Sequence, residues 1–302
     1  MNTRLMKPFL FIAIIAALST ACDKIEAPYV IIEQKDTTQC PAPEFPQLTT
    51  QSYKRVLVED YTGHFCPNCP RAGVIAHDLI EQYHDTVVVL AVHAGFFAKV
   101  NANDPIWAYD FRTIAGTEWD NFFKVGAVGN PNGMVNRKGY PNNQVLSPSA
   151  WGNEVKKAIK EAPLVDLQMI AEYDATKDNL CIHTKTTFLQ PISGRNLNIS
   201  IVLSENHIVQ AQKNSDPLVG TTPDILDFEH NHVMRGAVNG IWGIPILSSS
   251  ETSSTPVVKS FPAHFTGFNL NAMVPDNCYV VAFVYDVDTK EVLQVTQVKA
   301  TL

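Results

Sequence analysis

Two cysteines separated by two residues are the part of this sequence best suited to chemistry. Residues 66–70 read Cys-Pro-Asn-Cys-Pro, after an apolar segment and before a helical pattern. Such a pair can close a small disulfide and leave its first sulfur able to exchange with another disulfide. A helix N-terminus lowers the pKa of a nearby thiol and stabilises the attacking thiolate. The spacing indicates thiol–disulfide exchange, with Cys66 as the nucleophile and Cys69 as the resolving thiol.

Pro70 modifies this expectation, because proline has no N–H to donate to the carbonyl four residues earlier. We therefore expect the helix to begin near Cys69 and Cys66 to lie just outside its first turn. Two other roles stay open. The pair can be a permanent structural disulfide in a protein that only binds, or it can ligate zinc. Zinc needs two further ligands, and the nearby candidates are His64 and Cys40.

The segments around the cysteines predict a parallel strand–helix–strand unit. Residues 55–61 read as a strand, the helix after Cys69 has one apolar face, and residues 86–93 are nearly continuously apolar. Such a run is typical of a strand buried on both sides. A strand–helix–strand order implies an α/β crossover.

The rest of this first domain, which we bound at residues 53–163, has fewer signals. Residues 94–125 are rich in aromatic residues without strand alternation, and we expect a partly helical insertion there. A short strand is expected at residues 133–136. A last helix should begin at Pro148 with Ser147 as its N-cap.

From residue 164 the pattern changes to strands alone, and we expect an all-β sandwich over residues 164–302. The β-rich segments are separated by turns. They are residues 165–173, 180–188, 196–204, 257–265, 278–287 and 292–299.

Two groups of side chains in this second domain invite a prediction. Cys181 and Cys278 each begin a predicted strand, so we expect a disulfide between them. His230 and His232 alternate along a possible strand beside Glu229. They suggest a metal site, but the neighbouring Arg235 favours a structural polar cluster, and we predict no metal and no cofactor.

The N-terminus predicts export and lipidation. Arg4 and Lys7 precede an apolar run over residues 9–18, as in a signal peptide. The run is too short to span a bilayer, which takes about 20 apolar residues. Small residues directly before Cys22 suit a lipoprotein signal peptidase. We predict a signal peptide at residues 1–21, a lipid such as palmitate on Cys22, and a proline-rich tether over residues 22–52.

Composition excludes nucleic acid as a partner and gives the number of cysteines available for disulfides. The net charge is −7 and charged residues make up 18% of the chain, so no basic surface is available for nucleic acid. Export favours disulfides. The chain has six cysteines, and lipidation of Cys22 leaves an odd number, with Cys40 unassigned. The oligomeric state cannot be predicted.

Residues 56–69, together with Pro131, resemble a thioredoxin fold. In such proteins a cis proline faces the cysteine pair, and Pro131 in Gly-Asn-Pro-Asn-Gly matches that position. The resemblance implies that an acidic residue six places before the first cysteine assists proton transfer. Asp60 occupies that place, and Glu59 is the competitor one residue earlier.

The whole chain resembles a lipoprotein family related to a twenty-eight-kilodalton outer membrane protein of Gram-negative anaerobes. Four stretches carry the likeness: the segment before Cys22, residues 60–63 leading into 66–70, residues 131–137, and residues 230–237. The resemblance implies a cell outer-membrane lipoprotein, on the periplasmic or the surface face. It also implies an α/β thioredoxin-like domain followed by an all-β immunoglobulin-like sandwich.

Two functions are compatible with these features. The first is a thiol–disulfide oxidoreductase that exchanges disulfides with exported proteins. The second is a non-enzymatic envelope or surface lipoprotein that binds protein or glycan through its β domain, with Cys66 and Cys69 as a structural disulfide.

Overall fold

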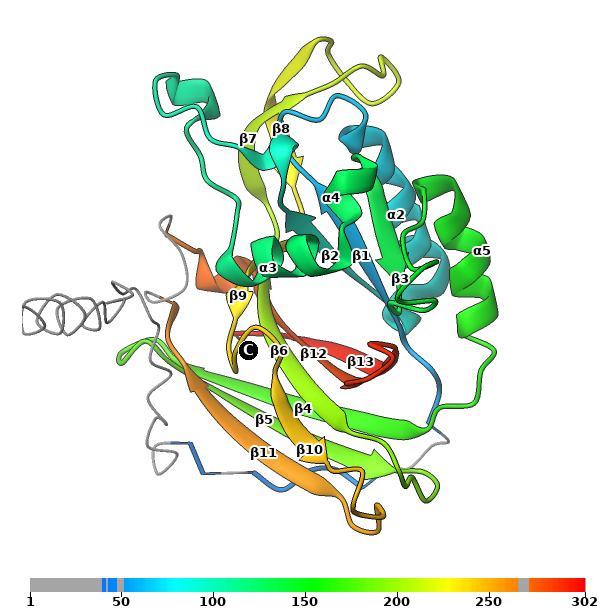
Figure 1. Ribbon diagram of the computed structural model, residues 1–302. Coiled ribbons are helices and arrows are strands. Elements are labelled where there is room, and N and C mark those ends of the chain that lie inside the picture. The colour runs from blue at the N-terminus through cyan, green and yellow to red at the C-terminus, as the bar shows by residue number, and fades with distance from the viewer. Residues whose placement is uncertain (1–39, 42, 48–51, 266–271, 302) are drawn as a thin grey trace, which may run out of the picture. The chain divides into compact units, whose positions relative to one another are not determined.

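The computed structural model describes residues 40–41, 43–47, 52–265 and 272–301. These residues belong to one unit, which runs from Gln34 to Leu302. Figure 1 shows a β-rich body with helices around part of it. The predicted signal peptide and lipidated Cys22 lie outside the described residues.

The predicted strand–helix–strand unit is confirmed. Strand β1 (Val56–Thr62) is followed by helix α2 (Cys69–Tyr83) and strand β2 (Val87–His93), and β1 pairs with β2 in parallel. Strand β3 (Asn132–Val135) pairs antiparallel with the other side of β1. Every residue of β1 and β2 is buried because the sheet is covered on both faces.

The predicted insertion contains short helical elements. They are η3 (Phe96–Ala98), η4 (Pro105–Trp107), α3 (Ile114–Phe123) and α4 (Val125–Val128), preceded by η2 (His84–Thr86) at the end of α2. Helix α5 (Pro148–Ala158) begins at the predicted proline, with Ser147 as its N-cap.

All six β-rich segments predicted after residue 164 form strands. They are β4 (Val165–Asp174), β5 (Asn179–Phe188), β6 (Leu197–Glu205), β11 (Val257–Ala263), β12 (Cys278–Asp286, after η6, Pro275–Asn277) and β13 (Val292–Lys299). The sequence pattern did not reveal the four further strands between β6 and β11. They are β7 (Ile208–Lys213), β8 (Asp224–His230), β9 (Val233–Ala237) and β10 (Ile244–Leu247). The sequence suggested a possible strand through His230 and His232, where the structure has the end of β8 and a turn.

One eight-stranded sheet contains strands from both halves of the chain. Its order is β13-β12-β6-β9-β2-β1-β3, with β10 also paired to β6. The two halves join where β9 lies parallel to β2, at Ala91 and Val233, and Ala91 N–H donates to His232 O at 2.8 Å. The division into two domains at residue 163 stays a prediction, and the sheet runs across that position.

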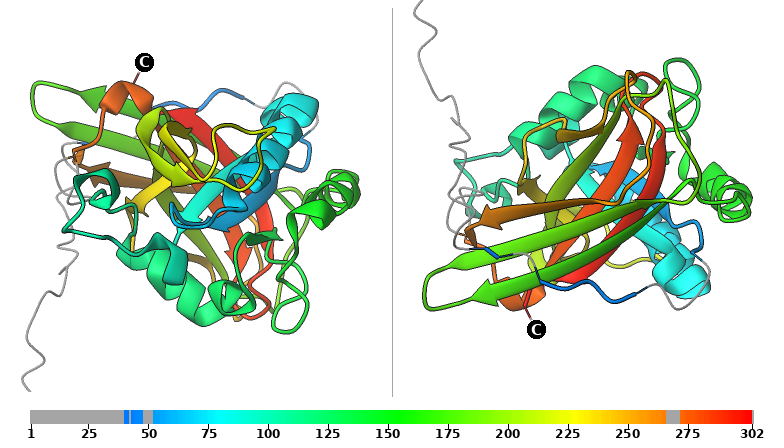
Figure 2. Two further views of the ribbon diagram at one scale, coloured as in Figure 1. Left: turned by 90° about the horizontal axis from the view of Figure 1, so that it is seen from above. Right: turned by 90° about the horizontal axis from the view of Figure 1, so that it is seen from below.

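A three-stranded sheet, β11-β5-β4, covers the half of the large sheet formed by β6, β12 and β13. Figure 2 shows the small sheet crossing in front of the red C-terminal strands when the molecule is seen from below. Between them lies an apolar core to which alternate residues of each strand contribute, including Leu167 of β4, Ile182 of β5 and Ile201 of β6. The opposite face of β6 and β12 packs on α3, so these strands are buried on both sides.

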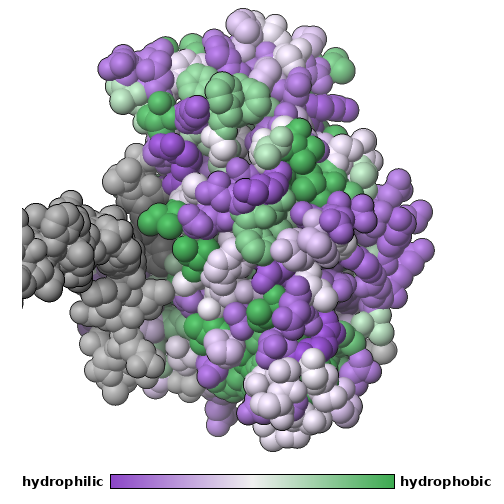
Figure 3. Space-filling model, viewed as in Figure 1, coloured by the Kyte–Doolittle hydropathy of each residue, from purple (hydrophilic) through white to green (hydrophobic). Residues whose placement is uncertain are grey.

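No helix among the described residues is long and apolar enough to cross a membrane. The face in Figure 3 mixes hydrophilic and hydrophobic side chains, and its right edge, where α5 lies, is hydrophilic.

Candidate functional site

Cys66 and Cys69 form a disulfide at the entry to α2, with their Cα atoms 5.4 Å apart. The loop after β1 turns tightly, because Cys66 N–H donates to Gly63 O at 2.9 Å. Helix α2 begins at Cys69, with Asn68 as its N-cap and Pro70 in the first turn. The predicted helix start is therefore confirmed. Cys66 lies before the first turn, where the favourable field of the helix weakens.

Gly63 is required by the close approach of the η3 turn. A Cβ atom at this position would lie 2.4 Å from the backbone carbon of Phe97. Phe65 N–H donates to Phe97 O at 3.0 Å, which fixes the two segments together. Phe65, the aromatic residue before the first cysteine, stacks on Trp107 with ring centroids 4.9 Å apart. The insertion thus supports the cysteine loop from one side.

The two adjacent carboxylates of β1 point to opposite faces of the sheet. Glu59 lies on the face of Leu57 and Tyr61, which belongs to the core beneath α3. Asp60 lies on the face of Val58, which packs with helices α2 and α5. Strand alternation therefore assigns Asp60, and not Glu59, to the side of the sheet that carries the cysteine helix.

Glu59 is committed to a buried ion pair. Its carboxylate accepts two hydrogen bonds from Arg137, at 2.8 and 2.7 Å, and both side chains are at most 1% exposed. The guanidinium carbon of Arg137 also lies 4.6 Å from the ring centroid of Trp119 and 4.9 Å from that of Phe283. The pair is a structural unit that ties β1 to the loop after β3.

Asp60 is also buried but, unlike Glu59, has no ion-pair partner among the described residues. It is 4% exposed, and its Oδ1 atom has no hydrogen-bond partner within the described ranges. Burial raises its pKa from 3.8 to about 7. A carboxyl with this pKa can gain and lose a proton near neutral pH, and the proton-transfer role of Asp60 stays a prediction.

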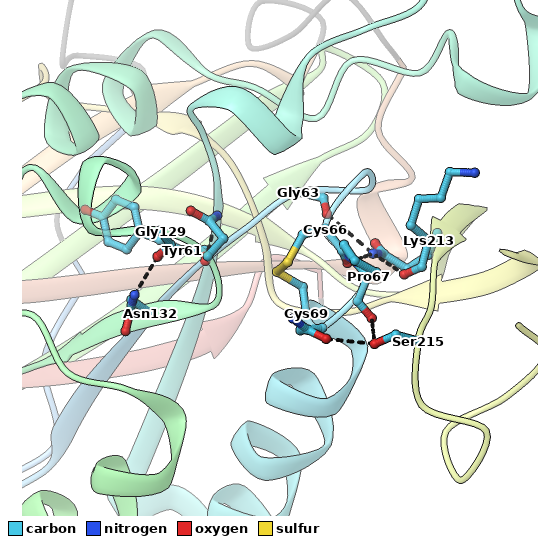
Figure 4. Close-up of a disulfide and its surroundings, with 12 residues drawn as sticks. Tyr61, Gly63, Cys66, Pro67, Cys69, Gly129, Asn132, Lys213 and Ser215 are labelled. Atoms are coloured by element: carbon cyan, nitrogen blue, oxygen red, sulfur yellow. Dashed lines mark hydrogen bonds between the residues drawn. A yellow bond between two sulfur atoms is a disulfide. The ribbon is translucent and has the colours of Figure 1, made fainter. Parts of the chain in front are cut away.

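The loop before β3 carries Pro131, and the peptide bond between Asn130 and Pro131 is cis. Asn130 Nδ2 donates to Tyr61 O at 3.0 Å, and Asn132 Nδ2 donates to Gly129 O, so the loop is held against the end of β1. Figure 4 shows Gly129 and Asn132 on the side of the disulfide opposite to Lys213. The conformation is the one that the resemblance implied, and the role of Pro131 stays a prediction.

The disulfide is buried, which the sequence did not predict. Cys66 is 1% and Cys69 is 3% exposed. The end of β7 and the following residues lie against the cysteine loop: Gln212 Nε2 donates to Cys66 O at 2.9 Å, and Ser215 N–H donates to Pro67 O at 2.8 Å. These contacts join residues that are 146 or more positions apart, and no local signal in the sequence announces them.

Three buried histidines lie beside this region. The rings of His64, His93 and His230 surround Phe111, with centroid distances of 5.6, 4.4 and 4.5 Å. Burial lowers the pKa of all three histidines, to about 3 for His230. They are therefore neutral, and the cluster is aromatic packing. No group of three or more His, Cys, Asp or Glu side chains within the described ranges is arranged to hold a metal ion.

The predicted disulfide between Cys181 and Cys278 is wrong. Cys181 is bonded to Cys40 and not to Cys278. Cys181 lies in the small sheet while Cys278 begins β12 of the large sheet, so the two strands belong to different layers. Cys278 is a buried free thiol whose pKa is raised to about 12 by burial. Because Cys40 is in a disulfide, it also cannot join His64 as a zinc ligand.

These features define a class: an α/β protein, rich in β-sheet, with a Cys-Pro-Asn-Cys disulfide at a helix entry and a cis-proline loop beside it. A family model for outer membrane protein Omp28 matches residues 119–301. The chain belongs to this Omp28 outer membrane protein family and is located at the outer membrane. The cysteine pair lies before the matched residues.

Solved structures give further likenesses. HBP35 of Porphyromonas gingivalis matches with a TM-score of 0.54 and 16% identity, over 83% of this chain and 76% of that chain. This likeness concerns the fold alone. A domain of the outer membrane lipoprotein Omp28 from Porphyromonas gingivalis is 26% identical over 47% of this chain and 91% of that one, with a TM-score of 0.31. A protein from Agrobacterium tumefaciens gives a TM-score of 0.49 and 13% identity, over 83% of this chain and 96% of that one. No curated protein sequence matches the chain.

Proposed function

We propose that this protein is an outer-membrane lipoprotein that exchanges disulfides with exported proteins through a thioredoxin-like site. The observation that carries the proposal is the Cys66–Cys69 disulfide at the start of α2. The Asp60 carboxyl, whose Oδ1 atom has no partner among the described residues, lies on the face of β1 that packs with α2. Permanent structural disulfides do not require a buried acid that titrates near pH 7.

In the reduced protein, the Cys66 thiolate attacks one sulfur of a partner disulfide, and the partner's other sulfur leaves as a thiolate. The Cys69 thiol then gives its proton to the ionised Asp60 carboxylate and attacks Cys66. This step releases the partner's second thiolate and restores the Cys66–Cys69 disulfide. Two electrons pass from the cysteine pair to the partner, and the same steps run in reverse oxidise a partner dithiol. The loop that carries Pro131 would dock the partner backbone.

The proposal also includes the lipid anchor and the two domains that the sequence predicts. We propose a lipid anchor on Cys22, a thioredoxin-like domain over residues 53–163 and an immunoglobulin-like domain over residues 164–302. A Cys22→Ser variant should leave the membrane fraction. Intact-mass measurement of the wild-type protein should show the added lipid.

A trapping experiment tests the exchange function. The variant Cys69→Ser, in a Cys278→Ser background that removes the free thiol, should accumulate mixed disulfides with envelope proteins on Cys66. The matched variant Cys66→Ser should accumulate far fewer adducts, because it retains only Cys69, which is the resolving and not the attacking cysteine of the pair. If Cys69→Ser forms no adduct and the reduced wild-type protein cannot reduce a model disulfide, the exchange function is excluded.

The burial of both sulfurs favours a second candidate. A disulfide whose cysteines are 1% and 3% exposed has the accessibility of a structural cross-link, in a lipoprotein that binds protein or glycan through its β domain. The same trapping experiment separates the candidates, since a structural cross-link gives no adduct.

A further inference from the structure

Strands β7 and β8 form a hairpin that leaves the main sheet. They continue β6 and β9, which pair in the large sheet, but β7 and β8 pair with each other in a separate two-stranded sheet. The bend between the two parts has a defined construction. His207 and His232 adopt the left-handed φ values of 61° and 57°. Their N–H groups donate to the side chains of Asn231 and Asn206, at 2.9 and 2.7 Å.

This bend accounts for a motif that the disulfide site does not use. Residues 230–232 read His-Asn-His, and they end β8 and turn the chain into β9. At the bend, the N–H groups of His207 and His232 donate to asparagine side chains in place of backbone carbonyls of the neighbouring strand. Both chains therefore change direction at facing positions. The bend directs the hairpin toward the cysteine loop, and Figure 1 shows it above the start of α2.

The hairpin binds the cysteine loop through main-chain hydrogen bonds. Lys213 N–H donates to His64 O at 2.8 Å, and Ser215 N–H donates to Pro67 O at 2.8 Å. The two donors are two residues apart and their acceptors three residues apart, so the segment follows the cysteine loop without forming a regular strand pair. These bonds anchor the end of β7 to the cysteine loop on either side of Cys66.

Two side chains of the same segment add to this contact. The amide of Gln212, which is 2% exposed, donates to Cys66 O at 2.9 Å. The hydroxyl of Ser215 contacts Pro67 O at 3.1 Å and Asn68 Oδ1 at 2.7 Å. Figure 4 shows Lys213 and Ser215 against Cys66 and Pro67. The contacts reach the residues of the Cys-Pro-Asn-Cys segment itself.

An attacking sulfur must reach one sulfur of the disulfide, so a buried disulfide exchanges slowly. Outside the cysteine loop the hairpin is attached near the bend and at the end of β7, and His230 at the end of β8 packs on Phe111. Ile208 packs in a small cluster with Phe111 and Val233, and Lys213 lies 4.9 Å from the ring centroid of Trp107. Strand β8 is mostly exposed or half-exposed, and a two-stranded hairpin of this kind can open locally at a lower free-energy cost than unfolding of the whole protein.

We propose that the β7–β8 hairpin is a latch on the disulfide site. In the latched state, residues 212–215 hold the carbonyl groups of His64, Cys66 and Pro67, and the cysteine loop keeps its disulfide buried. Exchange requires the hairpin to swing away at the bend formed by residues 206–207 and 231–232. This inference rests on the proposed exchange function and names its regulation.

The test measures how fast dithiothreitol reduces each disulfide of the native, oxidised protein. Samples are quenched with acid, alkylated and analysed by peptide mass spectrometry. The double variant Gln212→Ala/Ser215→Ala removes the side-chain hydrogen bonds of the latch. With each such bond contributing modestly to the closed state, we expect Cys66–Cys69 to be reduced roughly 5- to 30-fold faster. Gln210→Ala, on the same strand, is the matched control and should leave the rate within about twofold of the wild type.

The Cys40–Cys181 disulfide is an internal reference in the same molecule. Its two cysteines are also buried, at 2% and 7% exposure. If the latch opens locally, only the Cys66–Cys69 rate rises in the double variant. Equal rates in wild type and double variant would overturn the proposal. Parallel acceleration of both disulfides would also overturn it, because opening would then be global.

A second variant removes the hairpin altogether. Glu205 and Val233 are paired across β6 and β9, so residues 206–232 can be replaced by Asn-Gly, which favours a two-residue hairpin turn. The Cys66–Cys69 disulfide should then be reduced at least as fast as in the double variant. An unchanged rate in a folded deletion variant would refute the latch. The outcome is independent of the exchange function: a latch without exchange gives faster reduction by dithiothreitol but no trapped partner.

Discussion

Replacing Asp60 by asparagine should stabilise the protein at alkaline pH, and the structure gives the size of the effect. The carboxyl is buried, its Oδ1 atom lacks a partner among the described residues, and its pKa is raised from 3.8 to about 7. A folded-state pKa above the unfolded value means that the folded state binds more protons between these two pH values. The free energy of unfolding therefore falls as the pH rises through this window.

The magnitude follows from the difference between the two pKa values. Three pKa units correspond to about 4 kcal/mol once the pH exceeds the folded-state pKa. About 2 to 3 kcal/mol of this falls between pH 5 and pH 8. Asp60→Asn removes the ionisation, so the variant should lose this part of the pH dependence. Its largest gain in stability over the wild type should occur at pH 8.

Urea unfolding of the oxidised proteins at pH 5 and pH 8 measures the effect. The quantity of interest is the change in unfolding free energy between the two pH values, compared between wild type and variant, because contributions of all other ionisable groups cancel in that comparison. Asp78→Asn, an exposed position on α2, is the matched control and should follow the wild type. If Asp60→Asn and the wild type show parallel pH dependence, Asp60 is not ionising in a buried environment and its assignment to proton transfer fails.

Three further substitutions test the framework around the site. Glu59→Gln leaves the guanidinium of Arg137 buried without its carboxylate, and should lower the free energy of unfolding by about 3–5 kcal/mol. Cys181→Ser opens a disulfide with a sequence separation of 141; denaturant unfolding should show a loss of up to about 5 kcal/mol on the chain-entropy account. Gly133→Ala would place a Cβ atom 2.3 Å from Glu59 O; a loss of about 3 kcal/mol or more is expected from overpacking, measured in the same way.

Each of these predictions has a control within the chain. Gly152→Ala on α5 meets nothing closer than 3.8 Å, and should raise stability by up to about 1 kcal/mol through helix propensity. If Gly133→Ala behaves like Gly152→Ala, the contact between β1 and β3 is not as tight as described. A Cys40→Ser/Cys181→Ser double variant should match Cys181→Ser alone. A Glu59→Gln variant as stable as wild type would show that the ion pair contributes nothing.

The parts of the fold that the sequence predicted are those with local signals. The strand before the cysteines, the helix that starts at Cys69 and the helix that starts at Pro148 follow from apolar periodicity and from the missing N–H of proline. The six predicted β-strands are long and strongly apolar on at least one face. By contrast, β8 is mostly exposed or half-exposed, so its composition carries no burial pattern to detect.

The sequence predicted the parts of the site whose roles depend on residues nearby in the chain. It did not predict those that depend on contacts between distant residues. The spacing of Cys66 and Cys69 revealed the disulfide, and the place of Asp60 six residues earlier favoured it over Glu59. The sequence did not reveal that Glu59 pairs with Arg137, 78 positions away. The pairing of Cys181 depended on which sheet each strand joins, and that is a property of the topology. Gln212 donates a hydrogen bond to Cys66 O from 146 positions away, and nothing near either residue in the sequence indicates this contact.

The Cys40–Cys181 disulfide turns most of the first half of the chain into a covalent ring. The ring spans 141 positions and contains β1, the cysteine pair, the insertion and α5. A protease that cuts once at any point inside this ring cannot release a fragment, since both pieces stay attached through the two sulfurs. The exposed side chain of Phe96 in the insertion marks a place where such a cut can occur. A nicked protein would keep its mass on a non-reducing gel and separate into two pieces only after reduction.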